Sequence, residues 1–363
     1  MVVLHFAAIS DNPYNGVCVA APQHVISEKR YATTGLININ NKHIKALESY
    51  PGTQIEYKKP FDIEKLPEPF DQPDLVVFHE CYRAEYVAIA INLLRRKIPY
   101  VIIPHGELRT EAQKKKRIKK HFANLLLFNL FIRKAAAIQC LSKEEEEATF
   151  FGRMKILGTN GICIPEKSKA AFHTDKIIFI YIGRYEWRVK GLDILFQAIR
   201  MEARVLRENH AVFELYGPDT LGRLAEVKKL VEQNQVEDLV KLNLAISGTV
   251  KEQKLLDSDV FIQTSRHEGM PMGVLEAMSY AIPCLLTDGT NVGRYIEAIG
   301  AGWNGGMEAS ALAKAIRTAI EDRVLWKEKG KTAREYVKKE YNWDFVSMNT
   351  VEKYKEICML GKK

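Results

Sequence analysis

The stretch Ser258-Asp-Val-Phe-Ile-Gln-Thr-Ser-Arg-His-Glu-Gly-Met-Pro-Met-Gly-Val-Leu-Glu-Ala-Met-Ser-Tyr280 decides the fold. Its apolar run from Val260 to Gln263 predicts a buried strand, which leads into a loop containing glycine and proline. A helix is predicted to begin near Met272. Glu268 then lies in the loop, and Glu276 lies about one turn inside the helix. Ligands of parallel α/β sheets bind beyond strand ends of this kind, so the loop is the first candidate for a site.

The start of this helix suits a phosphate group. A helix N-terminus presents unpaired N–H groups and a partial positive charge. Gly269 and Gly273 let a ligand approach the backbone closely. A diphosphate on these amides would leave Glu268 and Glu276 to bind one polyol on each side, which is the shape of a nucleotide-sugar. The alternative is a solvated pair of glutamates, with Glu276 favoured only by its place in the first turn of a helix.

The residues from Glu268 to Cys284, Glu-Gly-Met-Pro-Met-Gly-Val-Leu-Glu-Ala-Met-Ser-Tyr-Ala-Ile-Pro-Cys, resemble the Glu-x7-Glu motif of retaining GT-B glycosyltransferases, most closely glycosyltransferase family 4. The resemblance implies that Glu268 contacts hydroxyls of the donor sugar and that Glu276 contacts the ribose. It also implies that the intervening segment binds the diphosphate. That segment consists of Gly269, Met270, Pro271, Met272, Gly273 and Val274.

A second part of the expected donor site precedes this motif in the chain. The apolar run from Lys176 to Arg184 predicts a buried strand that ends at Gly183. Arg184 and Lys190 follow that strand before a predicted helix from Leu192 to Arg200, so they are placed to hold a diphosphate. The alternative is salt bridging at the surface. The segment also resembles the part of the family whose arginine and lysine hold the donor diphosphate, and this implies the same role for Arg184 and Lys190.

Three further positions are weaker candidates for donor binding. Gly217 ends a predicted strand, and Val250 follows another, where the resemblance implies loops that border the base. Gly16 follows a cluster of turn residues after the first predicted strand, and a glycine there can bring a loop close to a phosphate or a sugar. The resemblance implies that this loop lines the acceptor cleft. For Gly16, an ordinary turn is the alternative.

The first half of the chain predicts alternating strands and helices, and hence a parallel sheet with helices on both faces. Asp11, His79 and His105 fall at the carboxyl ends of predicted strands, where ligands bind. His105 lies in Pro104-His-Gly-Glu, and the resemblance implies that a histidine here lies near the donor sugar. The alternative is a histidine bonded to neighbouring backbone.

The stretch from Arg109 to Lys134 carries nine basic residues and one acid, which matches the net charge of +8 for the whole chain. Its cationic run precedes an apolar segment that is too short to span a bilayer, as in a helix lying on an anionic membrane. The alternatives are a solvated basic end on a buried helix and, last, nucleic-acid binding, for which no aromatic platform accompanies the charges. The predicted membrane or acceptor residues are Lys114, Lys115, Lys116, Arg117, Lys119 and Lys120.

The composition of the 363 residues indicates a globular protein of two domains. No apolar run reaches about 18 residues, and the first residues lack the pattern of a signal peptide. The six cysteines are scattered without metal-site spacing, so we expect buried thiols in a reducing, cytoplasmic compartment. No metal or other cofactor is expected.

The expected fold class is α/β of the GT-B kind, with two doubly wound Rossmann-like domains that face a central cleft. Residues 1–168 would bind the acceptor, and residues 169–342 would bind the nucleotide-sugar. Helix 343–363 would cross back to the first domain, as the resemblance implies.

The expected activity is hexosyl transfer with retention from a nucleoside diphosphate sugar to a hydroxyl of an acceptor. A UDP-sugar is favoured over a GDP-sugar. The basic stretch suggests a lipid-linked saccharide acceptor in bacterial envelope polysaccharide synthesis, at the inner face of the cytoplasmic membrane. The alternatives are a GT-B-like sugar-nucleotide epimerase and a non-catalytic nucleotide-sugar-binding subunit at a membrane surface.

Overall fold

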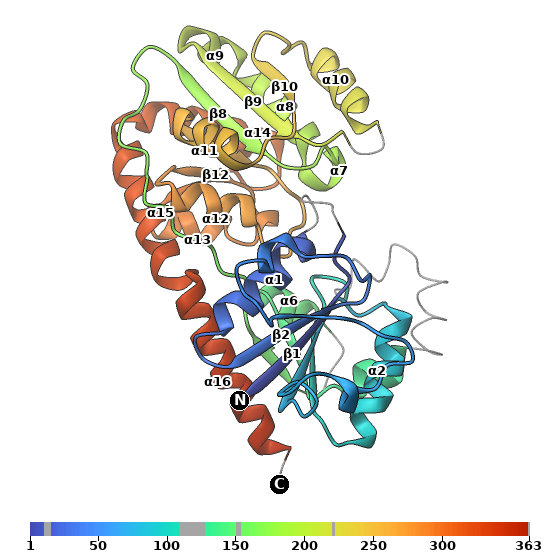
Figure 1. Cartoon of the computed structure of the whole chain (residues 1–363). Coiled ribbons are helices and arrows are strands. Elements are labelled where there is room, and N and C mark those ends of the chain that lie inside the picture. Colours follow the sequence, from blue (N-terminus) through green and yellow to red (C-terminus); the bar gives the residue numbers. More distant parts are fainter. Residues whose placement is uncertain (11–15, 109–127, 150–153, 220–221, 362–363) are drawn as a thin grey trace. The chain divides into compact units, whose positions relative to one another are not determined.

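A computed structural model describes residues 1–10, 16–108, 128–149, 154–219 and 222–361 (Figure 1). The chain divides into two compact units. Unit 1 comprises Met1–Gly161 together with Trp343–Lys363, and unit 2 comprises Ile162–Asn342. The sequence placed the domain boundaries after residues 168 and 342.

Unit 1 is built on a seven-stranded parallel sheet in the order β3-β2-β1-β4-β5-β6-β7. Its strands are β1 (Val2–Ala7), β2 (Thr33–Asn38), β3 (Gln54–Ile55), β4 (Leu75–His79), β5 (Tyr100–Ile103), β6 (Ala137–Cys140) and β7 (Lys155–Leu157). Its helices include α1 (Gly16–Glu28), α2 (Ala84–Arg95), α5 (Asn129–Lys134), α6 (Lys143–Ala148) and α16 (Trp343–Leu360). Short 3-10 turns η1 (Lys45–Leu47) and η2 (Ile63–Lys65) lie in its connections.

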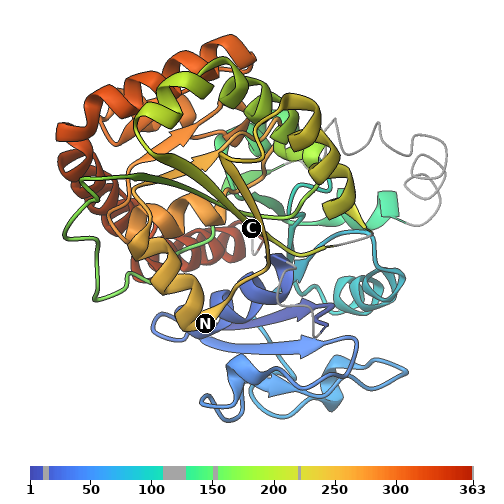
Figure 2. The ribbon, with the colours of Figure 1, turned by 90° about the horizontal axis from the view of Figure 1, so that it is seen from above.

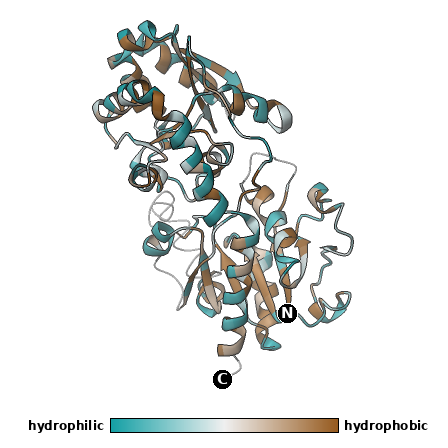
Figure 3. Cartoon of the chain, turned by 90° about the vertical axis from the view of Figure 1, so that its left-hand side faces the viewer, coloured by the Kyte–Doolittle hydropathy of each residue, from teal (hydrophilic) through white to brown (hydrophobic). Residues whose placement is uncertain are grey.

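Both faces of this sheet are covered. Neighbouring residues of one strand belong to different core clusters: Leu36 packs on one face and Ile37 on the other. This alternation is what the pleat of a strand requires. Its strands are coloured as hydrophobic in Figure 3, whereas the surrounding helices carry both colours. Strands buried on both faces read as continuous apolar runs, which explains why most of them could be predicted.

Unit 2 repeats the design with a six-stranded parallel sheet in the order β10-β9-β8-β11-β12-β13. Its strands are β8 (Ile177–Ile182), β9 (Ala211–Gly217), β10 (Val240–Leu244), β11 (Val260–Gln263), β12 (Cys284–Leu286) and β13 (Gly302–Asn304). Its helices are α7 (Trp187–Lys190), α8 (Leu192–Met201), α9 (Ala203–Glu208), α10 (Arg223–Asn234), α11 (Gly248–Asp257), α12 (Met272–Ser279), α13 (Gly293–Ala298), α14 (Ala309–Glu321) and α15 (Trp326–Glu340), with 3-10 turns η4 (Asp288–Thr290) and η5 (Asp322–Leu325).

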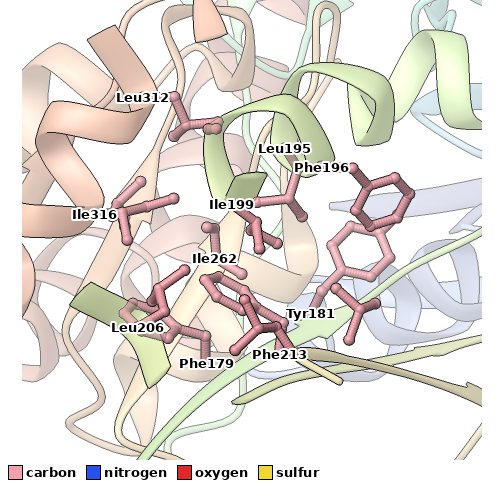
Figure 4. Packing of buried hydrophobic residues seen from close by; sticks show 14 of the residues in the cluster. Phe179, Tyr181, Leu195, Phe196, Ile199, Leu206, Phe213, Ile262, Leu312 and Ile316 are labelled. Atoms are coloured by element: carbon pink, nitrogen blue, oxygen red, sulfur yellow. The ribbon is translucent and has the colours of Figure 1, made fainter. Parts of the chain in front are cut away.

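The larger core of unit 2 lies between its sheet and the helices α8 and α14. Phe179 of β8 stacks on Phe213 of β9, with ring centroids 4.6 Å apart. Ile199 of α8 and Leu312 and Ile316 of α14 belong to the same cluster (Figure 4). A second cluster under α12 and α15 covers the opposite face, so this sheet also lies between helices (Figure 2).

The C-terminal helix α16 belongs to unit 1, as the predicted crossing back requires. It packs on α1, where the Ser347 and Ser27 hydroxyls are 2.7 Å apart. Farther along α16, the Tyr354 hydroxyl donates to Oε1 of Gln139 at 2.6 Å. This helix begins at Trp343, and the residues before it form α14 and α15, which are separated by η5.

Most of the stretch from Arg109 to Lys134 lies outside the described residues. Its described end is α5, where Phe131 and Ile132 are 1% and 0% exposed. Phe131 stacks on Tyr100 with 5.5 Å between ring centroids, and Phe128 also joins the core of unit 1. The apolar end of the predicted membrane-surface helix is therefore buried in the protein. Of the helices that the structure describes, none combines the length and apolar character needed to cross a bilayer.

Candidate functional site

The order of strands in unit 2 identifies one edge of its sheet as the place to look for a site. The chain runs outward from β8 through β9 to β10 and, on the other side, from β11 through β12 to β13. The crevice between β8 and β11 is thus a topological switch point, where ligands of doubly wound sheets bind beyond the carboxyl ends. Gly183 and Arg184 follow β8 at this edge, and the loop containing Glu268 follows β11.

Glu268 is held in place by three hydrogen-bond donors. Its Oε1 accepts from Nζ of Lys190 at 2.6 Å, from Nε2 of Gln263 at 2.6 Å and from Oγ of Ser265 at 2.5 Å. The side chains of Glu268 and Lys190 are each 13% exposed. Burial, and after it the charge of Glu268, raises the pKa of Tyr181 well above 10. The Tyr181 hydroxyl therefore keeps its proton near pH 7. The structure thus brings two of the predicted site residues, Lys190 and Glu268, into direct contact.

The backbone around Lys190 is joined to the loop after β11. Gly191 has φ +61°, and a Cβ atom there would lie 2.0 Å from the carbonyl oxygen of Thr264. The Thr264 hydroxyl in turn donates to the carbonyl oxygens of Lys190 and Gly191, at 2.9 and 3.1 Å. The guanidinium of Arg266 forms a bidentate pair with Asp193, at 2.7 and 2.8 Å. Gly191 is therefore required by a close approach of two chains that fixes Lys190 beside Glu268.

The N-terminus of α12 offers fewer free amides than its sequence suggests. Pro271 has no N–H, the amide of Met272 donates to Met270 O at 2.9 Å, and the amide of Val274 donates to Pro271 O at 2.9 Å. The amides of Gly269, Met270 and Gly273 have no acceptor within the described residues. Of the predicted segment from Gly269 to Val274, these three amides are the ones that remain for an anion.

The two glycines of this segment are not demanded by packing. A Cβ atom at Gly269 would meet nothing within 4 Å, and one at Gly273 would make ordinary contacts, the nearest 3.4 Å from the carbonyl oxygen of Ile182. The latter contact places the first turn of α12 against the end of β8. The open space at Gly269 leaves room for a ligand at the backbone.

Glu276 is paired with a lysine that sequence reasoning missed. Lys251 of α11 makes a short contact with Oε2 of Glu276, and the two side chains are 25% and 27% exposed. Val250, the preceding residue, is 55% exposed. Each glutamate of the predicted pair is thus matched with a lysine from a different element. No local pattern points to Lys251, because α11 meets α12 only through the folded sheet.

Arg184 and the other predicted glycines of this unit are placed differently. Within the described chain, the Arg184 guanidinium pairs with Glu186 at 3.0 Å, is 52% exposed and makes no bond to Glu268. A Cβ atom at Gly183 would lie 2.5 Å from the Tyr181 hydroxyl, and one at Gly217 would lie 2.2 Å from Gly183 O. Close packing within the protein is therefore sufficient to explain why glycine occupies both positions.

In unit 1, His105 follows β5 in a left-handed backbone conformation, with φ +48°, and Gly106 has φ +84°. The Gly106 amide donates to Oε1 of Glu145 at 2.5 Å, and the Cys81 amide donates to Oε2 of Glu107 at 2.7 Å. These partly buried contacts hold His105 in a backbone conformation that is uncommon for residues other than glycine, and such conformations often occur in functional loops. The pKa of His105 is lowered to about 3, first by burial and then by His24, so its ring is neutral near pH 7.

The remaining predicted residues give little structural information. Gly16 is the first residue of α1, and a Cβ atom there would meet nothing within 4 Å. Asp11 and the basic residues Lys114, Lys115, Lys116, Arg117, Lys119 and Lys120 lie outside the described residues. Among the residues that are described, no group of three or more metal-ligating side chains is arranged to hold a metal ion.

A hollow of about 690 Å³ lies elsewhere on unit 2. Its lining includes Ile299, Lys331, Tyr336 and Lys339, and none of the predicted site residues. The switch point, rather than this hollow, combines a fixed ion pair with open amides, and it is the stronger candidate for a site.

A comparison with protein-family models matches residues 164–342 to the family Glycosyl transferases group 1. No curated protein matches the sequence. Among solved structures, sucrose-phosphate synthase from Thermosynechococcus elongatus has a TM-score of 0.73 at 16% identity, with 98% of each chain covered. HepE from Anabaena, in complex with UDP and glucose, has a TM-score of 0.71 at 16% identity, with 98% of this chain and 100% of that chain covered. A glycosyltransferase from Rickettsia africae ESF-5 has a TM-score of 0.69 at 15% identity, with 98% of each chain covered.

At these identities the structural likeness shows the fold, and the predicted two-domain α/β architecture of the GT-B kind is confirmed. The matched family region is nearly coextensive with unit 2, which runs from Ile162 to Asn342. Residues 164–342 therefore form a domain of the glycosyl transferases group 1 kind.

Proposed function

We propose that this protein transfers a hexosyl unit, with retention of configuration, from a nucleoside diphosphate sugar to a hydroxyl of a saccharide acceptor. The observation that carries the proposal is the Lys190–Glu268 pair at the switch point of unit 2, beside the open amides of Gly269, Met270 and Gly273. A UDP-sugar is favoured, and the UDP complex of the structurally similar HepE supports that choice.

The chemical demand of such a transfer is the stabilisation of a diphosphate leaving group. Its developing negative charge is best met by donors that are already in position. Lys190 supplies a full positive charge, and the three open amides supply oriented dipoles at the start of a helix. Arg184 has a long and exposed side chain, which would turn from Glu186 to the diphosphate. With these groups, the proposed mechanism uses no metal ion.

Donor binding would rearrange the ion pairs of this site. A diphosphate competes with Glu268 for Lys190, so binding would release the carboxylate to accept hydrogen bonds from the sugar hydroxyls. Glu276 would accept from the ribose in the same way, while Lys251 continues to balance its charge. The two roles proposed for Lys190 and Glu268 are therefore coupled through one contact.

Replacement of Glu268 by glutamine tests the assignment. The change keeps the shape of the side chain and removes its charge, so the protein should fold and the rate of sugar transfer should fall at least about 100-fold. The control is Glu202→Gln, because Glu202 is a partly buried glutamate of unit 2 that pairs with Arg317 at 2.7 Å away from the motif. Normal transfer by the Glu268 variant would contradict the assignment.

The same assay separates the alternative activities. Labelled UDP-sugar incubated without an acceptor would be converted to an epimer by an epimerase but not by the proposed transferase. A binding subunit would retain the donor and form no product with any saccharide acceptor. Thermal stabilisation of the protein by a panel of UDP- and GDP-sugars selects the donor for both experiments, since a ligand of the native state raises the melting temperature by mass action.

We propose in addition that unit 1 binds the acceptor and that the acceptor is a lipid-linked saccharide of bacterial envelope polysaccharide synthesis, at the inner face of the cytoplasmic membrane. The support is the basic run from Lys114 to Lys120, since each basic residue near an anionic surface contributes about 1 kcal/mol. Replacement of Lys114, Lys115 and Lys116 by glutamate should weaken sedimentation with anionic liposomes. The control replaces Lys331, Lys338 and Lys339, three exposed lysines of α15. Equal binding of both variants would count against a membrane role.

A further inference from the structure

A hydrogen-bonded network of four histidines and one glutamate runs through unit 1 behind His105. Nε2 of His105 lies 3.1 Å from Nδ1 of His79, and Nε2 of His79 lies 3.1 Å from Nδ1 of His5. Nε2 of His5 then lies 3.1 Å from Oε2 of Glu28. The other oxygen of Glu28 lies 3.3 Å from Nδ1 of His24. The network joins the loop after β5 to β4, β1 and α1.

The interior of this network is closed to solvent. His5, His79 and Glu28 are 0% exposed, His24 is 1% exposed, and His105 alone is partly exposed. At its inner end, Nε2 of His24 lies 3.0 Å from Oδ1 of Asn160. The His24 ring also packs edge-to-face with the indole of Trp343, with centroids 5.1 Å apart. Buried polar groups that are so fully paired fix one another's orientation.

The charges of three members follow from their surroundings. Burial would raise the pKa of Glu28, but the electrostatic and hydrogen-bond interactions with His5 and then His24 outweigh burial, so that the pKa falls to about 2. Burial, followed by the neighbouring histidines, lowers the pKa of His79 well below 6.5. His105 has a pKa of about 3. Near pH 7, Glu28 is therefore ionised, and His79 and His105 are neutral.

An ionised carboxylate without solvent needs a positive partner, because an unpaired buried charge is strongly destabilising. The titratable side chains that face Glu28 are His5, His24 and Tyr354 of α16. The Tyr354 hydroxyl donates to Gln139, and the charge of Glu28, after burial, raises its pKa well above 10. One of the two histidines must therefore carry the compensating proton.

The contacts of His24 favour it as the cation. It has an oxygen facing each ring nitrogen, Glu28 on Nδ1 and Asn160 on Nε2. With the Asn160 amide oriented as in this structure, its oxygen facing the ring, a neutral His24 that donates to Glu28 would bring the lone pair of Nε2 against the lone pairs of that oxygen. A protonated His24 donates to both oxygens and leaves no such conflict.

We propose that the buried His24–Glu28 ion pair sets the direction of every hydrogen bond in this network and so keeps Nδ1 of His105 unprotonated, as an acceptor for a hydroxyl of the saccharide ligand. With Glu28 ionised and His24 protonated, neutral His5 donates from Nε2 to Glu28. His79 then donates from Nε2 to His5, and His105 donates from Nε2 to His79. The remaining nitrogen of His105, Nδ1, has no partner among the described residues. The ligand named here rests on the proposed function, whereas the tautomers do not.

The two ends of the network are thereby linked. If the proton sat on His5 instead, that ring would have to donate from Nδ1 to His79, and each later bond would reverse. His105 would then present an N–H at Nδ1, which repels the hydrogen of a hydroxyl donor. His5, His24, His79 and Glu28 are positioning residues in this sense, because they act on a ligand only through His105.

Nuclear magnetic resonance of the full chain labelled with ¹⁵N-histidine tests the proposal without any ligand. Two-bond correlations from ring protons to ring nitrogens distinguish the two neutral tautomers from the doubly protonated ring. We expect His5, His79 and His105 to carry their proton on Nε2, and His24 to carry protons on both nitrogens. A proton on Nδ1 of His105, or a neutral His24, would overturn the proposal.

Two variants sharpen the measurement. Glu28→Gln removes the charge with almost no change in shape, and it should abolish the doubly protonated signal of His24. His43→Gln is the control, because His43 is an exposed histidine that lies outside the network. An unchanged His24 signal in the Glu28 variant would contradict the ion pair. If that variant does not fold, the tautomers of the unmodified protein decide the question.

Addition of the UDP-sugar that stabilises the protein tests the ligand role. Acceptance of a hydroxyl hydrogen bond should shift the Nδ1 resonance of His105 and leave that of His43 in place. No shift at saturating donor would remove the ligand role of His105. The apo spectrum is independent of catalysis, so failure of the transferase proposal would leave the tautomer result intact, and the reverse also holds.

Discussion

Lys190 and Glu268 form an ion pair that is mostly buried, so water screens their charges only in part. Their contact of 2.6 Å joins side chains that are each 13% exposed. Two further donors, Gln263 and Ser265, hold the same carboxylate oxygen. An anion that takes Lys190 away therefore leaves Glu268 oriented by uncharged groups, which suits a carboxylate that must accept hydrogen bonds from a sugar.

Lys190→Met keeps the length of the side chain and removes its charge. Because the leaving diphosphate would lose a preorganised cation, kcat/KM for transfer should fall about 100- to 1,000-fold. Steady-state kinetics with the donor selected by thermal stabilisation provides the measurement. Arg200→Met on α8, an exposed position in the same unit, is the control, and a comparable loss there would point to general destabilisation.

Gly191→Ala tests the close approach of Gly191 to Thr264 that positions Lys190. The substituted alanine would have a left-handed φ of +61°, and its Cβ atom would lie 2.0 Å from the carbonyl oxygen of Thr264, so the free energy of unfolding should drop by more than the about 1–2 kcal/mol that the left-handed conformation alone costs. Gly222→Ala is a matched control, since Gly222 has φ +70° and open space around it. It should lose only the about 1–2 kcal/mol of the left-handed conformation. Urea unfolding of both variants decides, and equal losses would mean that the close approach at Gly191 is unimportant.

At the scale of elements, the strand–loop–helix unit from β11 to α12 shows what sequence can and cannot predict. Val260–Gln263 and the helix start at Met272 lie where expected, because apolar runs and glycine-proline loops are local signals. The state of the amides was not predictable in the same way. The turn at Pro271 takes up the N–H groups of Met272 and Val274, and this depends on backbone geometry that residue types do not specify.

Lys251 and the histidine network were missed for a related reason. Lys251 meets Glu276 only after the sheet places α11 beside α12. The network did leave a signal: His5 interrupts an apolar strand, and His24 and Glu28 are four residues apart on one helix. A polar residue inside a buried run calls for buried partners, which that spacing can supply.

The titratable groups of the histidine network should make the stability of unit 1 depend on pH, with a loss in acid. Below about pH 6.5, the unfolded chain takes up protons at His79 and His105 that the folded chain does not bind, because both pKa values are lowered by burial. Below about pH 4.5, the same applies to Glu28, whose pKa is about 2 when folded. The contribution of His79, His105 and Glu28 to stability is therefore fully present above pH 6.5 and is lost as the pH falls.

Urea unfolding from pH 8 to pH 4, followed by circular dichroism, measures this dependence. His79→Gln should flatten the decline between pH 6.5 and 4, and His43→Gln should leave it unchanged. An identical decline in all three proteins would show that the buried histidines contribute nothing to acid sensitivity.

At the scale of the whole molecule, the two parallel sheets could be predicted because alternating apolar runs and helical periods repeat along the chain. The return of α16 to unit 1 was implied by the family resemblance and not by periodicity. The sequence predicted donor-site roles for Lys190, Glu268 and Arg184. The structure joins the first two, whereas Arg184 pairs with Glu186. A long charged side chain can reach several partners, and only the folded structure determines which of them lie near it.

One measurement tests directly whether Glu268 and a diphosphate compete for Lys190. It is the calorimetric titration of UDP, with GDP in parallel, into three proteins: the unmodified protein, the Lys190→Met variant and the Glu268→Gln variant. The Lys190 variant should bind at least about tenfold more weakly, since a hydrogen bond to a charged group contributes about 1.5–3 kcal/mol. The Glu268 variant, freed of the competing carboxylate, should bind as tightly as the unmodified protein or more tightly, although it no longer transfers sugar. Equal affinity of the Lys190 variant and the unmodified protein, or equal weakening in both variants, would contradict a diphosphate seat at this ion pair.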